Sequence, residues 1–101
     1  MDGIFNVTIQ DTYLGKEDHG IPTCRICVEG DGFGSSFGNY ELRTYGIDMI
    51  LSMIEIVGAK SWEDLKGRYA RVKIANAKVE AIGHIIKDSW YNPEESEGNE
   101  I

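Results

Sequence analysis

The residues best suited to chemistry lie in one glycine-rich stretch, GDGFGSSFG, at positions 30–38. Glycine lets a backbone approach a ligand closely and adopt positive φ angles, so successive amides could bind an anion. Serine hydroxyls could add hydrogen bonds, and aromatic rings could stack on a base or on a partner side chain. From this region we predict five residues that bind a ligand or partner: Phe33, Ser35, Ser36, Phe37 and Tyr40.

The same stretch lacks the features of the known phosphate-binding loops. It has no lysine followed by a helix start, as a P-loop does, and no parallel crossover unit of the kind that carries a dinucleotide fingerprint. Glycines are also common in ordinary hairpins, where the aromatic residues would pack against the sheet. We favour this hairpin over the phosphate-binding loop, and both interpretations stay open.

A second candidate site is the outward face of the strand predicted at residues 69–75, YARVKIA. Tyr69, Arg71 and Lys73 alternate with apolar residues and should share one face. Together with Arg25 from another strand they would form a basic, aromatic stripe, as on sheets that bind single-stranded nucleic acid. The formal charge of −7 argues the other way, because nucleic-acid binders are usually basic. An ordinary solvated strand face is the alternative.

Metal binding and disulfide formation are not expected. Cys24 and Cys27 lie three residues apart in an alternating strand, so their side chains should point to opposite faces. A zinc site needs four ligands, and only His19 and His84 could supply imidazoles to complete one. We predict two free thiols, no metal and no cofactor.

Catalysis has one candidate in His84, which could act as a general base with Asp88 or Glu80. No activated nucleophile accompanies this histidine, because the serines cluster in loops and none stands in a serine-centred elbow. A structural or surface histidine is the simpler interpretation. We therefore expect a protein that binds and does not catalyse.

The elements that must position these residues show first the period of strands and then that of a helix. Strand patterns occur at residues 5–10, 24–29 and 35–43, a helical pattern at 45–60, and strand patterns again at 69–75 and 78–88, the last with a bulge at Gly83. This order predicts an α+β fold, a curved five-stranded antiparallel sheet packed on one helix, in an OB-like or a plainer arrangement. We expect one domain at residues 1–91 and an acidic, disordered tail at 92–101.

The predicted helix is apolar over most of its circumference. Asp48, Ser52 and Glu55 leave only a narrow polar stripe. A helix of this kind is buried on more than one side, so either a loop or a second subunit must cover the remainder. We predict a homo-oligomer whose interface contains Met49, Met53 and Ile56.

Two segments, YGIDMILSMIEIVGAKSWEDLKGRYARVKI and AIGHIIKDSWYNP, carry a resemblance to known proteins. The shared pattern is a helix ending in VG, then SWEDLKG, a basic strand, and IGHIIKD followed by an aromatic residue and an Asn-Pro pair. In these features the chain resembles a group of small phage and prophage proteins. The resemblance spans most of residues 15–93 and implies the cytoplasm of a bacterial host. It implies no catalytic residues.

Small phage proteins without a catalytic signature often act by binding, so we expect a counter-defence protein that inhibits a host system. It would either block a basic protein surface with its acidic surface, or sequester a small nucleotide signal. The alternative is an OB-like accessory protein that binds single-stranded DNA in phage replication or recombination. No membrane partner is expected, because no apolar run approaches the length of a membrane span.

Overall fold

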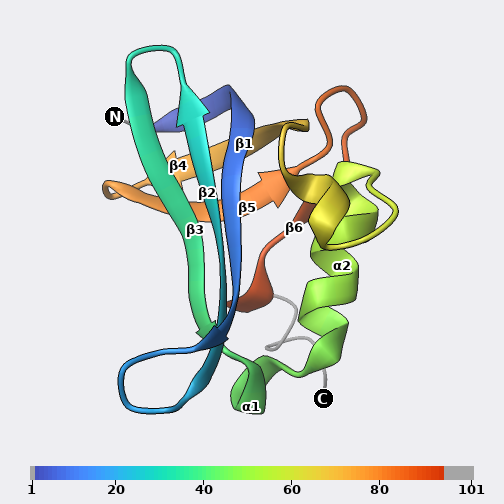
Figure 1. Cartoon of the computed structure of the whole chain (residues 1–101). Helices are drawn as coiled ribbons and strands as arrows, with labels where there is room; N and C mark the ends of the chain where they lie inside the picture. Colours follow the sequence, from blue (N-terminus) through green and yellow to red (C-terminus); the bar gives the residue numbers. More distant parts are fainter. Residues whose placement is uncertain (1, 95–101) are drawn as a thin grey trace.

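The computed structural model describes residues 2–94, and of Asn39 and Tyr40 only the backbone. Its strands are β1 (Gly3–Lys16), β2 (Pro22–Gly30), β3 (Phe33–Glu41), β4 (Tyr69–Ala75), β5 (Lys78–Gly83) and β6 (Trp90–Tyr91). Between β3 and β4 lie the helices α1 (Leu42–Tyr45) and α2 (Ile47–Val57) and a 3₁₀ turn, η1 (Glu63–Leu65) (Figure 1). The predicted α+β class and the curved antiparallel sheet with a helix against it are confirmed.

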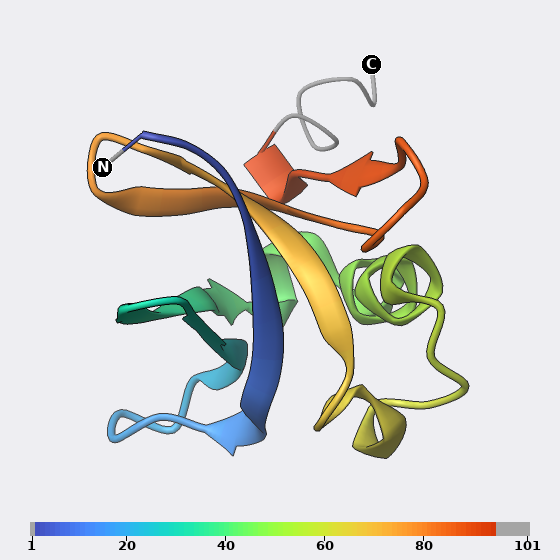
Figure 2. The same ribbon diagram turned by 90° about the horizontal axis from the view of Figure 1, so that it is seen from above.

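All six strands form one antiparallel sheet in the order β3-β2-β1-β4-β5-β6. β1 is the strand that joins its two halves: residues from Gly3 to Thr8 pair with β4, and residues from Thr8 to Lys16 pair with β2. The pairing with β2 shifts between Ile9 and Asp11, and such a bulge bends a strand and increases its twist. The sheet therefore curls into a half-barrel, with α2 beside its open side (Figure 2).

Three details of the fold differ from the prediction. A short sixth strand, β6, pairs with the end of β5, so the sheet has six strands where five were expected. The bulge in β5 lies at Glu80, because Lys73 pairs with Ala81 while Ile74 pairs with Val79, and Gly83 is regularly paired with Arg71. The helical segment is also divided, since Gly46 separates α1 from α2.

The core lies between the inner face of the sheet and α2. Alternate residues of the strands point into it, including Ala70, Val72 and Ile74 of β4, as the alternation in YARVKIA predicted. The buried residues of α2 are Met49, Ile50, Met53 and Val57, which recur at helical spacing. Residue 91 is not the end of the folded body, because Pro93 is fully buried and Glu94 forms an ion pair with Lys78 at 3.3 Å. The predicted tail beyond Glu94 lies outside the described residues.

Both cysteines are free thiols on β2 and face opposite ways. Cys24 points into the core, where burial raises the pKa of its thiol to about 11, and Cys27 is half-buried on the outer face.

Among residues 2–94, no helix is both long enough and apolar enough to cross a membrane.

Candidate functional site

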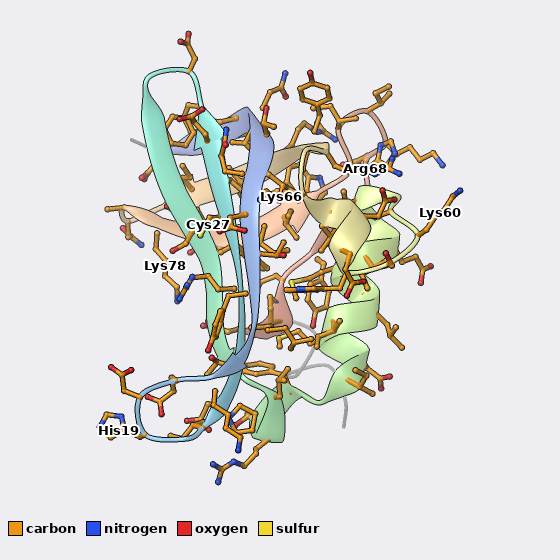
Figure 3. All side chains as sticks on the ribbon, viewed as in Figure 1. His19, Cys27, Lys60, Lys66, Arg68 and Lys78 are labelled. Carbon is orange, nitrogen blue, oxygen red and sulfur yellow. The ribbon has the colours of Figure 1, made fainter. Side chains whose placement is uncertain are left out.

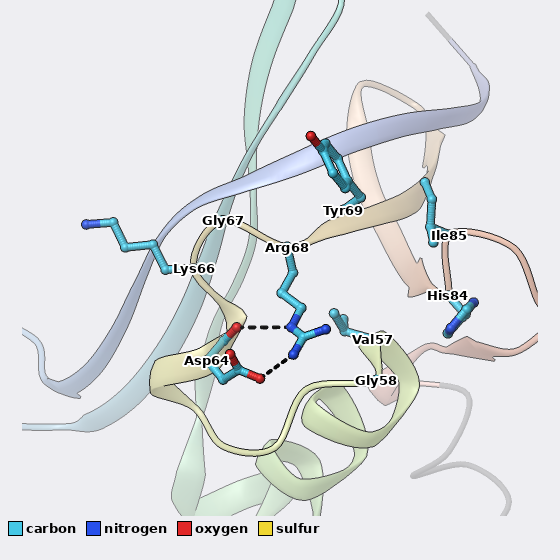
Figure 4. A pocket seen from close by; sticks show the side chains of 9 residues that line it. All are labelled: Val57, Gly58, Asp64, Lys66, Gly67, Arg68, Tyr69, His84 and Ile85. Atoms are coloured by element: carbon cyan, nitrogen blue, oxygen red, sulfur yellow. Dashed lines mark hydrogen bonds and ion pairs between the residues drawn. The ribbon is translucent and has the colours of Figure 1, made fainter.

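A cavity of about 490 Å³ opens where three segments of the chain meet. The end of α2 contributes Val57 and Gly58, and the β5–β6 connection contributes His84 and Ile85. The segment from η1 into β4 supplies the remaining lining residues, Asp64 and Lys66 to Tyr69 (Figure 4). The first and third segments are near neighbours in sequence, and the β5–β6 connection reaches them because β5 pairs with β4, which follows directly on η1.

His84 is held in one orientation and one tautomer by the loop that follows β5. Its Nδ1 accepts hydrogen bonds from the backbone amides of Ile86 and Lys87, each at 3.0 Å. Its own amide donates to the carbonyl of Ser89 at 3.1 Å. A ring nitrogen that accepts from amides carries no proton, so in the neutral imidazole the proton is on Nε2. The Nε2 edge of the ring faces Gly58, the glycine that ends α2.

Asp64 and Arg68 form an ion pair on the opposite side of the cavity. Arg68 Nη2 donates to Asp64 Oδ2 at 2.5 Å, and Arg68 Nε donates to the carbonyl of Asp64 at 3.3 Å. The amide of Lys60 also donates to Asp64 Oδ2, at 3.1 Å. The Lys60 amide and the Arg68 guanidinium together hold the pKa of Asp64 below its ordinary value. The carboxylate is therefore already occupied by partners from its own chain.

Two side-chain donors that line the cavity have no hydrogen-bond partner among residues 2–94. Arg68 makes no hydrogen bond there through Nη1, and His84 makes none through Nε2. Lys66 lines the cavity with its stem, but its ammonium points away (Figure 4) and lies 3.9 Å from Asp11. Lys60, Lys66 and Arg68 nevertheless gather at this end of the molecule, whereas Lys78 and His19 lie elsewhere (Figure 3).

Two features of the cavity oppose an anion. The C-terminus of α2 carries partial negative charge, which disfavours anions. Asp64 contributes a full negative charge, although Arg68 neutralises it. The carbonyls of Ile54 and Glu55 are satisfied by the amides of Gly58 and Ala59, so part of the helix-end charge is already compensated. Both opposing charges are therefore partly compensated by groups of the same chain.

The glycine-rich stretch forms a hairpin with its turn between β2 and β3. Ser35 pairs with Val28 and Ser36 with Cys27, so the residues predicted to cradle an anion belong to a sheet ladder. Phe37 is 0% exposed and fills the core, so it cannot contact a ligand. Phe33 packs edge-on against Phe5, with ring centroids 5.5 Å apart. The side chain of Tyr40, also predicted to bind, lies outside the described residues.

The outward face of β4 forms as predicted, but the stripe of four residues does not. Arg71 and Lys73 both lie over the ring of Trp90, at 4.9 and 4.5 Å from its centroid. Arg71 also donates to the carbonyls of His84 and Lys87, at 2.8 and 2.7 Å. Arg25 instead lies over Tyr13, at 5.2 Å, near the other end of β1. Arg71 thus has a structural role, and Tyr69, 67% exposed, is the member of the row that borders the cavity.

The catalytic pair considered from sequence is not formed. Asp88 accepts a hydrogen bond from Trp90 Nε1 at 3.0 Å, and His84 Nδ1 is taken by backbone amides. Glu80 is exposed at the β5 bulge. Within residues 2–94, no three His, Cys, Asp or Glu side chains lie close enough together to hold a metal ion.

The residues predicted to form an oligomer interface are covered by their own chain. Met49 and Met53 are each 1% exposed, and Ile56 is half-buried against the core. The prediction that these methionines form an interface is wrong, because the half-barrel curves around α2 and buries a wider arc of the helix than a flat sheet would. The exposed apolar residues of α2 are Ile47 and Leu51.

Sequence reasoning missed two residues, Arg68 of the cavity and Trp90 of β6. Arg68 stands in SWEDLKGR, where its i,i+4 spacing from Asp64 could have indicated the ion pair. Trp90 carries no local signal of its contact with β4, because that contact depends on how β6 pairs with β5. Comparison with protein-family models, with curated proteins and with solved structures finds no match for this chain.

Proposed function

We propose that this chain is a non-catalytic binding protein that captures a small anionic ligand of the nucleotide class in the cavity between α2, η1, β4 and the β5–β6 loop. One observation carries the proposal: two side-chain donors that line the cavity, Arg68 Nη1 and His84 Nε2, have no partner among residues 2–94. Donors select acceptors, and a charged acceptor such as a phosphate oxygen makes the stronger hydrogen bonds.

The size and the surroundings of the cavity support the nucleotide class. Its volume of about 490 Å³ falls within the ~300–1,000 Å³ typical of small-molecule sites. Tyr69 lines it with an exposed aromatic ring, on which a base could stack. A nucleotide could place its phosphate between Arg68 and His84 and its base against Tyr69. It would then use both the side-chain donors and the aromatic ring.

The resemblance to small phage and prophage proteins gives this binding a purpose. A protein made in an infected bacterial cytoplasm could sequester a nucleotide signal on which a host defence depends. The related mode of inhibition, in which the acidic surface blocks a basic protein groove, is supported by the formal charge of −7 alone. The cavity makes sequestration the better-supported mode.

Ligand-dependent thermal stability tests the proposal. Cyclic nucleotides, nucleoside monophosphates and ADP-ribose are each added to the full chain, with adenosine as the control that lacks phosphate. A ligand at a hundred times its dissociation constant should raise the melting temperature by roughly 10 °C for a domain of this size. Melting temperatures that stay flat across the panel would overturn the proposal.

A second candidate is an OB-like accessory protein that binds single-stranded DNA. Its support is the architecture: β1 is shared by both halves of the sheet, the helices lie between β3 and β4, and β3 approaches β5 across the open side. Fluorescent oligonucleotides should then bind with an affinity that falls steeply as salt rises. Because Arg71 is engaged by two carbonyls, Lys73→Met should weaken this binding more cleanly than Arg71→Met. No binding at low salt would remove this candidate.

A further inference from the structure

We propose that His84 contacts the ligand directly, and that its Nε2–H, opposite Arg68, makes the site select a phosphate group over a neutral one. This inference rests on the proposed function and adds to it the atom that recognises the ligand. It is carried by the way the loop fixes the imidazole, and by what faces its free edge.

The loop after β5 fixes the tautomer of His84. Two backbone amides, those of Ile86 and Lys87, converge on Nδ1 at 3.0 Å each. A proton on Nδ1 would point at two other protons, so this nitrogen is kept as an acceptor. The free edge of His84 is consequently a donor and not an acceptor. A ligand atom that meets Nε2 must itself accept.

The orientation of His84 is fixed as well. The main chain of His84 is held on both sides, by the carbonyl of Ser89 on its amide and by Arg71 Nε on its carbonyl at 2.8 Å. Arg71 also holds the carbonyl of Lys87, so both ends of this short turn are fixed to β4. A donor that is already oriented loses little conformational entropy when the ligand binds.

The edge of His84 that carries Nε2 borders the cavity beside the end of α2. The nearest atoms to a Cβ built on Gly58 would be Nε2 and Cδ2 of His84, at 3.7 and 3.8 Å. Gly58 has φ +88, which disfavours any residue with a side chain, so no Cβ stands between the end of α2 and the imidazole. Arg68 lines the same cavity; its guanidinium is held by Asp64, while Nη1 remains without a partner among residues 2–94. Two donors thus line one cavity, which suits a phosphate group with several acceptor oxygens.

A pair of substitutions separates the role of His84 in the loop from its role toward the ligand. In His84→Asn, the side-chain oxygen takes the place of Nδ1 and can accept from the amides two and three residues later, as in an Asx turn. This variant keeps the loop and lacks the donor at Nε2. In His84→Gln, the amide can reach the position of Nε2 but leaves the two backbone donors without their acceptor. Lys16→Met, at the far end of β1, controls for the loss of charge in Arg68→Met.

Binding of the nucleotide found in the thermal panel is then measured by calorimetry. We expect His84→Asn to unfold at the temperature of the unliganded wild type and to bind at least about tenfold more weakly, the cost of one hydrogen bond to a charged group. Arg68→Met should show a similar loss and Lys16→Met none. Unchanged affinity in His84→Asn, with the wild type binding, would overturn this inference and leave the proposed function standing. No nucleotide binding to the wild type would overturn both.

Nitrogen-15 NMR spectra of the imidazole distinguish a ligand contact from a purely structural role of His84. Only a contact would shift the Nε2 resonance when a ligand is added. The unliganded protein should show the proton of His84 on Nε2, and inorganic phosphate should shift the Nε2 resonance more than that of Nδ1. Acetate tests whether a carboxylate can supply the acceptor oxygen in place of phosphate. Adenosine is the neutral control and should leave the Nε2 resonance unmoved. A proton on Nδ1, or equal shifts with adenosine and phosphate, would refute the contact.

Discussion

Arg71 donates a hydrogen bond from Nε to the backbone carbonyl of His84 across 2.8 Å, so the middle of β4 holds the loop that borders the cavity. The same guanidinium reaches the carbonyl of Lys87 at 2.7 Å and lies over the ring of Trp90. Three segments, β4, the β5–β6 loop and β6, are thereby joined by one side chain. Arg71 was one of the residues predicted from sequence to bind a ligand or partner. We call its contacts with these three segments the Arg71 clamp.

Replacing Arg71 with methionine should loosen this loop. The substitution removes two hydrogen bonds from a charged donor and one cation–π contact, and we expect it to lower the free energy of unfolding by about 1–3 kcal/mol. Urea denaturation measures this loss, and hydrogen exchange should show faster exchange at the amides of Ile86 and Lys87. Lys73→Met is the matched control, since Lys73 shares the Trp90 ring but makes neither hydrogen bond, and it should cost less than about 1 kcal/mol. Equal losses of unfolding free energy in Arg71→Met and Lys73→Met would contradict the Arg71 clamp.

Replacing Met53 with glutamate should unfold the protein and not merely separate subunits. Met53 is 1% exposed, and an unpaired carboxylate placed there should cost more than about 3 kcal/mol. Circular dichroism of Met53→Glu should show lost structure, whereas Leu51→Glu, at a position 53% exposed on the same helix, should stay folded. A folded Met53→Glu would show that the packing is wrong. Homo-oligomer formation stays a separate prediction, and light scattering on the wild type measures it.

Replacing Gly38 with alanine should destabilise the β2–β3 hairpin. Gly38 has φ +135 at the irregularity where β3 passes Arg25, and an added Cβ would lie 2.7 Å from both the Arg25 Cα and the Cys24 carbonyl oxygen. Backbone strain and the clash together should cost at least about 1 kcal/mol. Gly34→Ala on the same strand meets only the Val28 carbonyl oxygen, at 3.8 Å, and should be nearly neutral in thermal unfolding. A neutral Gly38→Ala would argue against the register of β3.

Acid should weaken the fold through Asp64 and Glu17. The Lys60 amide lowers the pKa of Asp64, with Arg68 next, and the His19 side chain lowers that of Glu17. A carboxyl whose pKa is lower in the folded state stabilises the protein above its unfolded pKa, and that contribution is lost as pH falls through the folded value. Stability should therefore decline as pH drops below about 4. Both groups lie at the surface, so the effect should be modest and weaker at high salt.

The control for this acid effect is Asp64→Asn, which removes one of the two carboxyls. Its melting temperature should depend less on pH between about 2 and 4 than that of the wild type. Identical pH profiles for the two proteins would show that Asp64 contributes nothing. Thermal unfolding followed over that range makes the comparison.

The sequence by itself determined the parts of this protein that depend on neighbours along the chain. Alternation in YARVKIA set which face of β4 is buried, and the change to helical spacing marked α2. The turn at Asn76 and Ala77, which both adopt positive φ, was likewise readable from the short connection between two strand patterns. Each of these signals comes from backbone geometry within a few residues, so no knowledge of the fold was needed.

Only the tertiary structure decided where those elements meet. The bulge after Ile9 lets β1 serve both halves of the sheet, and the resulting curvature buries Met49 and Met53 within one chain. The same curvature brings Arg68 and His84 to opposite sides of one cavity. These contacts join residues far apart in sequence, and their geometry follows from strand register and sheet twist, which local patterns of polarity do not encode.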